Sequence, residues 1–510
     1  MRLTRYYNMV RVMRQGLLTL VFLLVLVPAG AEVRIMLVSD PHVMGPGLLV
    51  SEGEAWNNAI YSDRKLNDYS RAIFDEIIGI AIAEKPDLFL ISGDLTKDGE
   101  LLSHQYVVKK LYELKDAGIK AFVIPGNHDM GTSNALYYDG DLIRDADTIN
   151  TRQFADMYKD FGYGDDIDRE PTTLTWCCEP VKGLVLIGID TGHEDDPLNG
   201  VIPHVAFEWV CDRAEKATKA GKQVLVMMHH PLFPHVTNAE KFSSTYAVKL
   251  GMPIGDGSYA YYSYATMRNH LADAGVGVVL SGHVHVSDIA KDSNKYLTRT
   301  IYDICTSTCA AYPNPYRLLT LNEDDATMRI QTRYIQELPG VEDFKTLSEN
   351  RMTLGLQNLA KHNTQNKDVF NYFTEIFKVH IAGNEAEHPQ QQAYLNMYEE
   401  YLPQMKEDEQ ICDYLDTYGV TFDELTQMVY SMLEDKSNYG DADRENVLDD
   451  LDTTISVRGD NWTAIRRLES EARNRESGWY TLQGIRIPKP ERQGVYIHKD
   501  TSGTKLIHKH

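Results

Sequence analysis

Seven His, Asp and Asn side chains, found in five short clusters along the chain, have the composition of a metal site. They are Asp40, His42, Asp94, Asn127, His229, His283 and His285. Carboxylate and amide oxygens suit hard divalent cations and imidazole nitrogens suit borderline ones, so the mixture fits manganese, iron or zinc. Seven ligands exceed the needs of one four-coordinate ion but suit two ions that share a carboxylate. A single Asp or His after a strand is more often a helix cap, so the prediction of a binuclear metal site rests on the whole set.

Two of the clusters have a spacing that favours convergence. Asp40 and His42 are two residues apart, as are His283 and His285. In an extended segment, side chains at this separation point to the same side. We therefore expect extended backbone at both places, with each pair directed at one site.

The residues after Asn127 add a candidate acid. Asn127 itself is neutral, which limits negative charge around the ions and leaves an anionic substrate tolerable. His128 and Asp129 follow directly, and a carboxylate beside an imidazole holds its orientation and favours its charged form. Glycines that permit tight turns, and so a close approach of the backbone to the ions, accompany three clusters: Gly93, Gly126 and Gly282.

The elements that must position these clusters alternate between strand and helix. Six runs rich in Val, Ile and Leu predict strands buried on both faces: residues 33–38, 87–91, 120–124, 184–189, 223–228 and 276–280. Residues 69–84 and 101–117 carry apolar side chains at helical spacing. Each cluster follows the end of a strand, where open α/β sheets bind ligands. Taken alone, the pattern predicts an α/β core with one parallel sheet.

The clusters, in this order, closely resemble the motifs of the calcineurin-like metallophosphoesterase family. The motifs are Asp40-x-His42, Gly93-Asp94, Gly126-Asn127-His128-Asp129, a His that ends a strand, and Gly282-His283-x-His285. The resemblance covers residues 33–334 and implies a β-sandwich of two mixed sheets flanked by helices, in place of a single parallel sheet. We therefore expect a metallophosphoesterase domain over residues 32–338.

The resemblance also implies roles for the individual residues. One ion would be held by Asp40, His42 and His285, the other by Asn127, His229 and His283, with Asp94 bridging the two. His128 would face the scissile phosphate as an acid or charge stabiliser, with Asp129 behind it. Either His229 or His230 matches the fourth motif. We choose His229 because the family's ligand directly ends the apolar strand, which makes His230 a supporting partner.

The function implied is that of a metal-dependent phosphoric ester hydrolase. Two ions would generate a hydroxide that attacks phosphorus, with no covalent enzyme intermediate. Family members with Asp at the position of Asp129 include diesterases and also monoesterases. We expect a phosphodiesterase, with a phosphomonoesterase or nucleotidase as the alternative. A non-catalytic binding protein on the same fold is the alternative of a different class.

Substrate choice should depend on the segments between the motifs. Residues 44–65 follow the first cluster, and residues 234–264 follow the fourth and contain five tyrosines. Loops over strand ends carry specificity in such folds. The tyrosines are suited to stacking on a base or sugar, or to packing within an ordinary loop.

Composition narrows the class of partner. The chain has 510 residues, with 51 Lys and Arg against 74 Asp and Glu, and a formal charge of −23. Its hydrophobic content of 43% excludes a disordered chain. A negative chain without a Lys or Arg block argues against a nucleic-acid groove. A small-molecule phosphate ester remains a suitable substrate, because bound metals supply positive charge locally.

The two ends of the chain differ from its centre. Residues 1–31 have a basic start, an apolar run over 17–27 and an Ala-Gly-Ala end, which predicts a signal peptide and export to the periplasm, cell surface or medium. The run is shorter than the about 20 residues that a membrane span needs, so we expect no stable span after cleavage. The mature chain holds six cysteines, which we treat as structural.

Residues 339–475 are predicted to form a mainly helical domain, with helical spacing over 369–381, 392–405 and 422–433. Residues 476–510 are predicted to form a short β-rich tail. Its pattern of Trp479-Tyr480-Thr481-Leu482-Gln483-Gly484-x-Arg486, then Gly494-Val495-Tyr496-Ile497 and a basic end, resembles C-terminal segments of exported Bacteroidetes proteins, some of which are sorting signals. Runs at 484–487 and 494–497 predict two short strands joined by a loop.

Overall fold

The computed structural model describes residues 32–192, 200–254, 259–294, 299–322, 324–360, 366–385, 388–434, 449–458, 478–480, 486–487, 489, 494–500 and 503–509. The predicted signal peptide, residues 1–31, lies outside these ranges. Within them, no helix has both the length and the apolar character needed to cross a membrane. All six cysteines fall within them, and all are free thiols.

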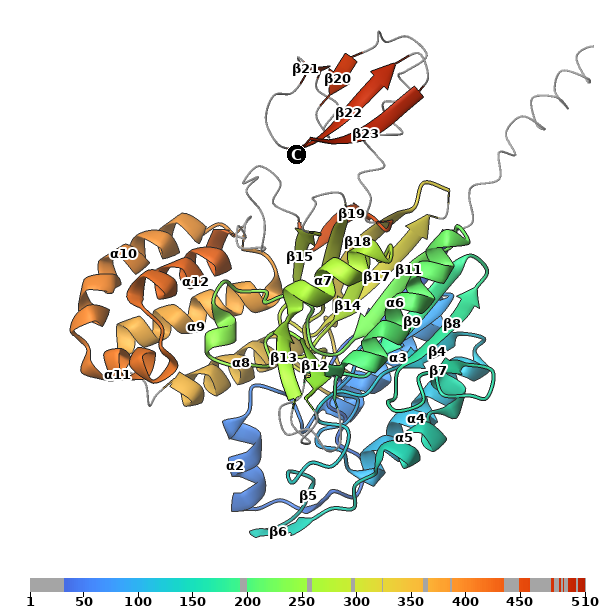
Figure 1. Cartoon of the computed structure of the whole chain (residues 1–510). Coiled ribbons are helices and arrows are strands. Elements are labelled where there is room, and N and C mark those ends of the chain that lie inside the picture. The colour runs from blue at the N-terminus through green and yellow to red at the C-terminus, as the bar shows by residue number, and fades with distance from the viewer. Residues whose placement is uncertain are drawn as a thin grey trace, which may run out of the picture.

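One mixed sheet of six strands, of which Figure 1 labels β4, β17, β18 and β19, carries the first three clusters. Its order is β19-β18-β17-β1-β3-β4, in which β1, β3 and β4 are parallel and the other strands antiparallel to their neighbours. The strands are β1 (Glu32–Val38), β3 (Leu88–Ile91), β4 (Lys120–Val123), β17 (Pro315–Asn322), β18 (Thr327–Tyr334) and β19 (Asp452–Ser456). Three of the predicted apolar runs therefore become β1, β3 and β4.

A second mixed sheet, of seven strands, carries the last two clusters. Its order is β15-β16-β14-β11-β9-β8-β7, with a parallel centre from β16 to β9. The strands are β7 (Asp168–Arg169), β8 (Trp176–Val181), β9 (Leu184–Ile189), β11 (Gln223–Met228), β14 (Val278–Ser281), β15 (Asp288–Ser293) and β16 (Thr300–Cys305). The other three predicted runs become β9, β11 and β14.

The two sheets share one apolar core, so side chains alternate along the strands between two environments. In β11, Leu225 and Met227 join the cluster that contains the strands of the first sheet. Val224, Val226 and Met228 instead pack under helices. Those helices are α6 (His204–Lys219) and α7 (Tyr264–Asp273), while α3 (Ser70–Glu84) and α4 (Leu101–Asp116) pack on the first sheet. The α/β fold with two mixed sheets is confirmed, and the single parallel sheet read from periodicity alone is wrong.

Shorter elements lie around the sandwich. They are α2 (Glu54–Ser62) and α5 (Thr151–Met157), a sheet of β2 (Leu49–Ser51), β5 (Leu136–Asp139) and β6 (Leu142–Asp145), and a sheet of β10 (Val201–Pro203), β12 (Lys249–Pro253) and β13 (Tyr259–Ser263).

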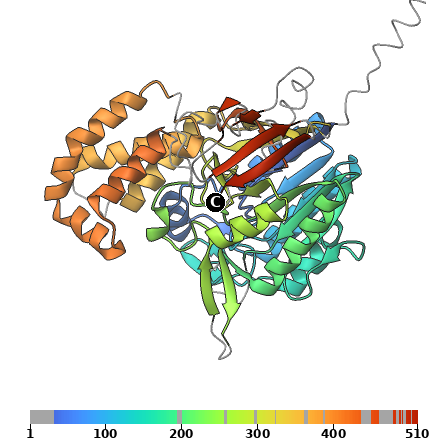
Figure 2. The ribbon, with the colours of Figure 1, turned by 45° about the horizontal axis from the view of Figure 1, so that its top comes forward.

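The region after the sandwich is helical, as predicted, and its helices group beside the sandwich in both views (Figures 1 and 2). They are α8 (Phe344–Ala360), α9 (Lys367–Ala382), α10 (Gln391–Glu407), α11 (Glu409–Tyr418) and α12 (Phe422–Glu434). Asn366 and Asp408 cap the N-termini of α9 and α11, and Gly383 and Gly419 end these helices with left-handed backbone. Helices α9 to α12 share a core of their own.

Two details differ from the expectation. Strand β19 lies within the range predicted as helical, but it pairs antiparallel with β18 and extends the first sheet. The tail forms a four-stranded sheet in the order β21-β20-β22-β23, from β20 (Gly478–Tyr480), β21 (Arg486–Ile487), β22 (Gly494–Asp500) and β23 (Gly503–Lys509). The two expected strands are β21 and β22, and β20 lies between them.

A buried ion pair fixes the loop after β11. Nδ1 of His235 lies 3.0 Å from Oδ2 of Asp288 in β15, and its Nε2 lies 3.4 Å from Oδ2 of Asp303 in β16. Burial alone lowers the pKa of a histidine, but the charges of these carboxylates and the hydrogen bonds to them raise the pKa of His235 to about 9. The charged imidazole thus ties this loop to the edge of the second sheet.

This ion pair should make stability depend on pH. Folding raises the pKa of His235 from 6.5 to about 9. The protonated ring therefore stabilises the folded state, fully below about pH 6.5, and this stabilisation is lost as the pH rises through 9. The full contribution is about 3 kcal/mol. The free energy of unfolding is measured with urea at pH 6.5 and at pH 10. Between these two pH values, wild type should lose about 3 kcal/mol more than His235→Gln does. As a control, His270→Gln, which changes an exposed histidine of α7, should show the same dependence of stability on pH as wild type. If His235→Gln also shows the wild-type pH dependence, the ion pair is not its source.

Candidate metal centre

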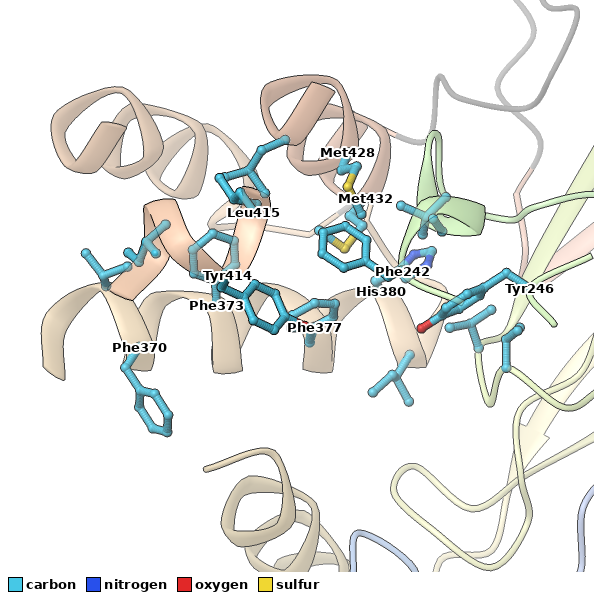
Figure 3. A pocket seen from close by; sticks show the side chains of 18 of the residues that line it. Phe242, Tyr246, Phe370, Phe373, Phe377, His380, Tyr414, Leu415, Met428 and Met432 are labelled. Carbon is cyan, nitrogen blue, oxygen red and sulfur yellow. The ribbon is translucent and has the colours of Figure 1, made fainter. Parts of the chain in front are cut away.

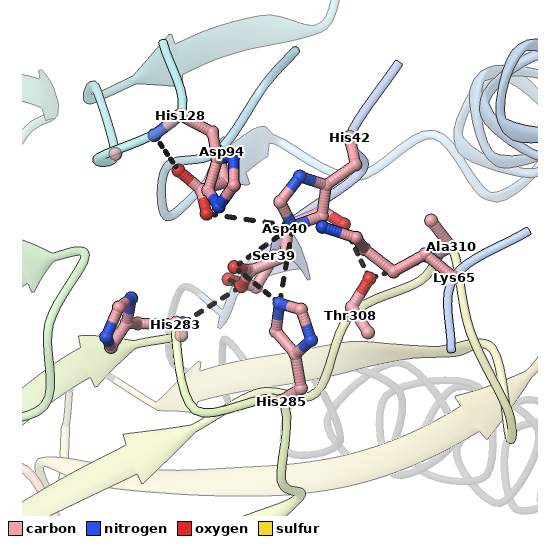
Figure 4. A network of polar contacts seen from close by, with 12 residues as sticks. Ser39, Asp40, His42, Lys65, Asp94, His128, His283, His285, Thr308 and Ala310 are labelled. Carbon is pink, nitrogen blue, oxygen red and sulfur yellow. Dashed lines mark hydrogen bonds and ion pairs between the residues drawn. The ribbon is translucent and has the colours of Figure 1, made fainter. Parts of the chain in front are cut away.

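The sandwich gathers all seven predicted metal-binding side chains at the C-terminal ends of parallel strands. Figure 4 shows five of them: Asp40, His42, Asp94, His283 and His285. From the first sheet, Asp40 and His42 follow β1, Asp94 follows β3 and Asn127 follows β4. From the second sheet, His229 follows β11, and both His283 and His285 follow β14. Positions that are up to 245 residues apart in the chain therefore meet in one place.

Two groups of three side chains have ligand atoms within 4.8 Å of one another: Asp40, His42 and His285, and Asp94, His229 and His283. In the first group, Nε2 of His285 lies 3.3 Å from Nε2 of His42 and 3.2 Å from Oδ1 of Asp40. Asn127 joins the second group, with its Oδ1 3.1 Å from Nε2 of His229 and 2.9 Å from Nδ1 of His283.

Asp94 lies between the two groups. Its Oδ2 is 3.6 Å from Nε2 of His42 and 3.3 Å from Nε2 of His229. Burial raises the pKa of this carboxyl, but the charges of His229 and His128 hold it well below its usual range. An ionised carboxylate in this position is the one that two cations would share.

The donor atoms fit divalent ions. Metal–nitrogen and metal–oxygen bonds of about 2.0 to 2.1 Å place neighbouring ligand atoms about 3.0 to 3.4 Å apart in octahedral or tetrahedral geometry. The contacts of 2.9 to 3.6 Å described above match this spacing. Two imidazole nitrogens that face each other, as those of His42 and His285 do, need a shared cation or proton. The residues present therefore fit a binuclear centre.

Neighbouring residues orient two of the histidines. Nδ1 of His229 is 2.9 Å from the backbone oxygen of Ser92, so the proton belongs on Nδ1 and the lone pair of Nε2 faces the cluster. Nε2 of His283 contacts Oγ1 of Thr245 at 3.1 Å, which leaves Nδ1 for the cluster. Sequence reasoning missed Thr245, although it lies within the segment to which specificity was assigned.

The structure directs His229, and not its neighbour His230, into the cluster. Nδ1 of His230 contacts Oγ1 of Thr191 at 2.9 Å, and its ring packs against that of His283 with centroids 4.1 Å apart. The ring of His230 thus lies behind a predicted ligand.

The prediction of extended backbone at the paired ligands is wrong. Five of the seven predicted ligands have positive φ angles: Asp40 (50°), His42 (42°), Asp94 (50°), His283 (66°) and His285 (58°). The side chains converge because each pair sits in a left-handed turn, not because a strand alternates. This conformation is costly for non-glycine residues, although Asp and His adopt it more readily than most, and such strain gathers at functional sites.

Two motif glycines are required for space. A Cβ on Gly126 would lie 2.2 Å from Oδ1 of Asp94, and one on Gly282 would lie 2.4 Å from Oδ2 of Asp40. Any side chain at these positions would displace a predicted ligand.

The expected pairing of His128 with Asp129 is also wrong. Nδ1 of His128 contacts Oδ1 of Asp98 at 2.8 Å. The carboxylate of Asp129 instead accepts hydrogen bonds from the backbone N–H groups of Leu95, Thr96 and Gly126. Adjacent residues in this turn point to opposite sides, so Asp129 organises the turn.

Asp98, which sequence reasoning missed, is the orienting partner of His128. Burial lowers the pKa of His128, but the charge of Asp94 and the hydrogen bond to Asp98 raise it above its usual value. Asp98 lies four residues after Asp94 in the same loop. This proximity to a predicted ligand is the feature of the sequence that could have identified it as a site residue.

One basic residue, Lys65, reaches the centre, and a second, Arg64, precedes it in the chain. The side chain of Lys65 extends toward His42 and Asp40 (Figure 4), and its nearest carboxylate oxygen, on Asp63, is 3.8 Å away. Burial lowers the pKa of His285, the Asp40 carboxylate opposes this, and the charges of Arg64 and Lys65 add to the lowering. Both lie at the end of residues 44–65, where substrate choice was expected.

Comparison with known proteins identifies the family of the chain. Among solved structures, the chain is similar to a dimetal phosphatase from Danio rerio, with 13% identity, 59% of this chain and 96% of that chain covered, and a TM-score of 0.40. It is also similar to the sulfate thiohydrolase SoxB of Thermus thermophilus, with 12% identity, 66% of this chain and 62% of that chain covered, and a TM-score of 0.30. No curated protein matches. The model of the calcineurin-like phosphoesterase family matches residues 33–287, which is half of the chain. The chain therefore belongs to the calcineurin-like phosphoesterases, a family of metal-dependent hydrolases.

Proposed function

We propose that this phosphoesterase hydrolyses a phosphodiester, with two divalent ions held by the seven gathered residues. The observation that carries the proposal is Asp94, whose Oδ2 lies within 3.6 Å of a histidine nitrogen in each ligand group. Bound ions would activate water and neutralise the non-bridging phosphate oxygens.

His128 is the residue suited to proton transfer. Its side chain is 28% exposed, and its Nδ1 is engaged by Asp98, which leaves Nε2 for the substrate. The nearby carboxylates favour the protonated ring. When the bond between phosphorus and the leaving oxygen breaks, Nε2 donates a proton to that oxygen, and an alcohol departs.

Preference for a diester rests on the resemblance to diesterases at the third motif, and the proton donor serves either ester, because a departing alkoxide needs a proton in both. One observation favours the alternative, a phosphomonoesterase: Lys65 adds a positive charge near the centre (Figure 4), which would suit a dianionic substrate. The two substrates therefore have to be compared directly.

Metal content and ester hydrolysis test the reaction class together. We expect the metal-free chain, reloaded with Mn, Fe or Zn, to bind about two ions and to cleave bis-p-nitrophenyl phosphate faster than p-nitrophenyl phosphate. Asp94→Asn should bind fewer ions and lose turnover, because both groups lose their shared carboxylate. Asp116→Asn, at an exposed position of α4, serves as the matched control.

Faster cleavage of the monoester would favour the monoesterase. Two bound ions with neither ester cleaved would favour the non-catalytic alternative.

The contact between His128 and Asp98 predicts a coupled pair. His128→Ala should lower kcat by about 10²-fold or more, and Asp98→Asn by about 10- to 100-fold, with metal content unchanged in both. In the His128→Ala background, Asp98→Asn should have little further effect, because Asp98 acts through the ring. Fully additive losses in the double variant would refute this role.

Export is a further part of the proposal and is supported by the features of residues 1–31. The exported protein should begin at Glu32 on N-terminal sequencing after cell fractionation. Replacing Leu20 and Leu23 by Arg within the apolar run should retain the chain in the cytoplasm. An exported chain with its first 31 residues intact would contradict cleavage.

A further inference from the structure

An apolar cavity lies where the helical region meets the loops that follow the last two clusters (Figure 3). Its volume is about 310 Å³, within the range of ligand pockets in proteins. On the helical side it is lined by Phe373 and Phe377 of α9, Leu415 of α11, and Met428 and Met432 of α12. Methionine side chains adapt to irregular shapes, so this wall is suited to a flexible apolar ligand.

The opposite wall belongs to the metallophosphoesterase fold and includes chain neighbours of the predicted ligands. Val284 lines the cavity, and it lies in the chain between the predicted ligands His283 and His285. Val286, on the other side of His285 in the chain, and Arg64 also line the cavity. The cavity therefore has an apolar end beneath the helices and, at Arg64, a positively charged end on the side of the loops that hold the predicted ligands.

One buried polar atom lies at the cavity without a partner among the described residues. Nδ1 of His380 contacts the carboxylate of Glu385, but its Nε2 is buried and makes no hydrogen bond. His380 lines the cavity (Figure 3). Because buried polar atoms in native proteins are nearly always hydrogen-bonded, a ligand hydroxyl is a suitable partner for this nitrogen.

We propose that the substrate is an amphiphile, a phosphate ester whose long apolar chain occupies this cavity while its phosphate lies at the metal centre. This inference rests on the proposed function and names its substrate class. Water adds its oxygen to phosphorus and loses a proton to solvent. The bond from phosphorus to one alcohol oxygen breaks, and that oxygen takes a proton from His128, so the apolar chain is unchanged.

Polar diesters fit the cavity less well. The base and sugar of a nucleotide carry several donors and acceptors that would lose their hydration on burial. The polar side chains in the lining are those of Arg64, Tyr246, His380 and Tyr414, too few to replace that hydration. An alkyl chain with a single hydroxyl, which would pair with Nε2 of His380, needs no other partner and gains from burial.

Binding without turnover tests the inference separately from catalysis. Dodecylphosphonate and methylphosphonate share one charged head group, and neither can be hydrolysed at its carbon–phosphorus bond. In calorimetric titrations of the metal-loaded full chain, the dodecyl compound should bind at least about tenfold more tightly. Met428→Trp, which fills the cavity, should abolish this advantage. Met397→Trp, a matched change on α10 outside the lining, should preserve it.

Equal affinity for the two phosphonates would overturn the proposal. Leu415→Phe narrows the cavity from α11 and serves as the second variant if Met428→Trp melts at a lower temperature than wild type. Tighter binding of the dodecyl compound that persists in both variants would also overturn the proposal. A chain that shows the advantage but cleaves no ester would refute the proposed function alone. The same titration with dodecylphosphonate in phosphatidylcholine vesicles and as dispersed monomer distinguishes two sources of the substrate. Tighter binding from vesicles would identify a membrane lipid, and tighter binding of the monomer would identify a dispersed alkyl phosphate.

Discussion

Two buried carboxylates, those of Asp40 and Asp94, set the condition that the rest of the structure meets. Both side chains are almost wholly excluded from solvent, where an uncompensated charge costs several kcal/mol. Imidazoles compensate them: against the effect of burial, His285 and His229 lower the pKa of Asp40, and His229 and His128 lower that of Asp94. Of these three histidines, His229 and His285 come from the opposite sheet. The two sheets must therefore pack in a single register, because a shift of one residue along β1 or β14 would turn these side chains to the other face.

Convergence of the ligands also imposes a backbone conformation that the surroundings must hold. Each non-glycine residue with positive φ costs about 1 to 3 kcal/mol. Hydrogen bonds across the site hold these turns: the N–H of His42 donates to the backbone oxygen of Asp94 at 3.0 Å, and Oγ1 of Thr308 donates to that of Asp40 at 2.6 Å. The same loops thus carry strain, buried charge and the predicted ligands, which concentrates chemistry at one edge of an otherwise regular sandwich.

The sequence was informative where one residue type or one periodicity decides the outcome. Continuous apolar runs located six strands, and the ordered motifs located all seven gathered side chains. The orientation of side chains was not accessible in this way. Whether His128 meets Asp129 or Asp98 depends on φ angles in a turn, and whether Asp40 and His42 converge through a strand or a left-handed turn depends on contacts with the opposite sheet. Strand β19 was missed because its partner, β18, is distant in the chain and the helices α8 to α12 lie between them.

Composition alone predicted no role for the helical region, α8 to α12. Its contacts with the metallophosphoesterase fold suggest one. Nζ of Lys241, in the segment after the fourth cluster, lies 2.5 Å from Oε1 of Glu424 at the start of α12. After the fifth cluster, the N–H of Ser287 donates to the backbone oxygen of Ile381 in α9 at 3.2 Å. The helices therefore rest on the two loops that supply the histidines of the second sheet. A ligand that filled the cavity would press on these same loops, so occupation of the apolar end and geometry at the charged end should be physically linked.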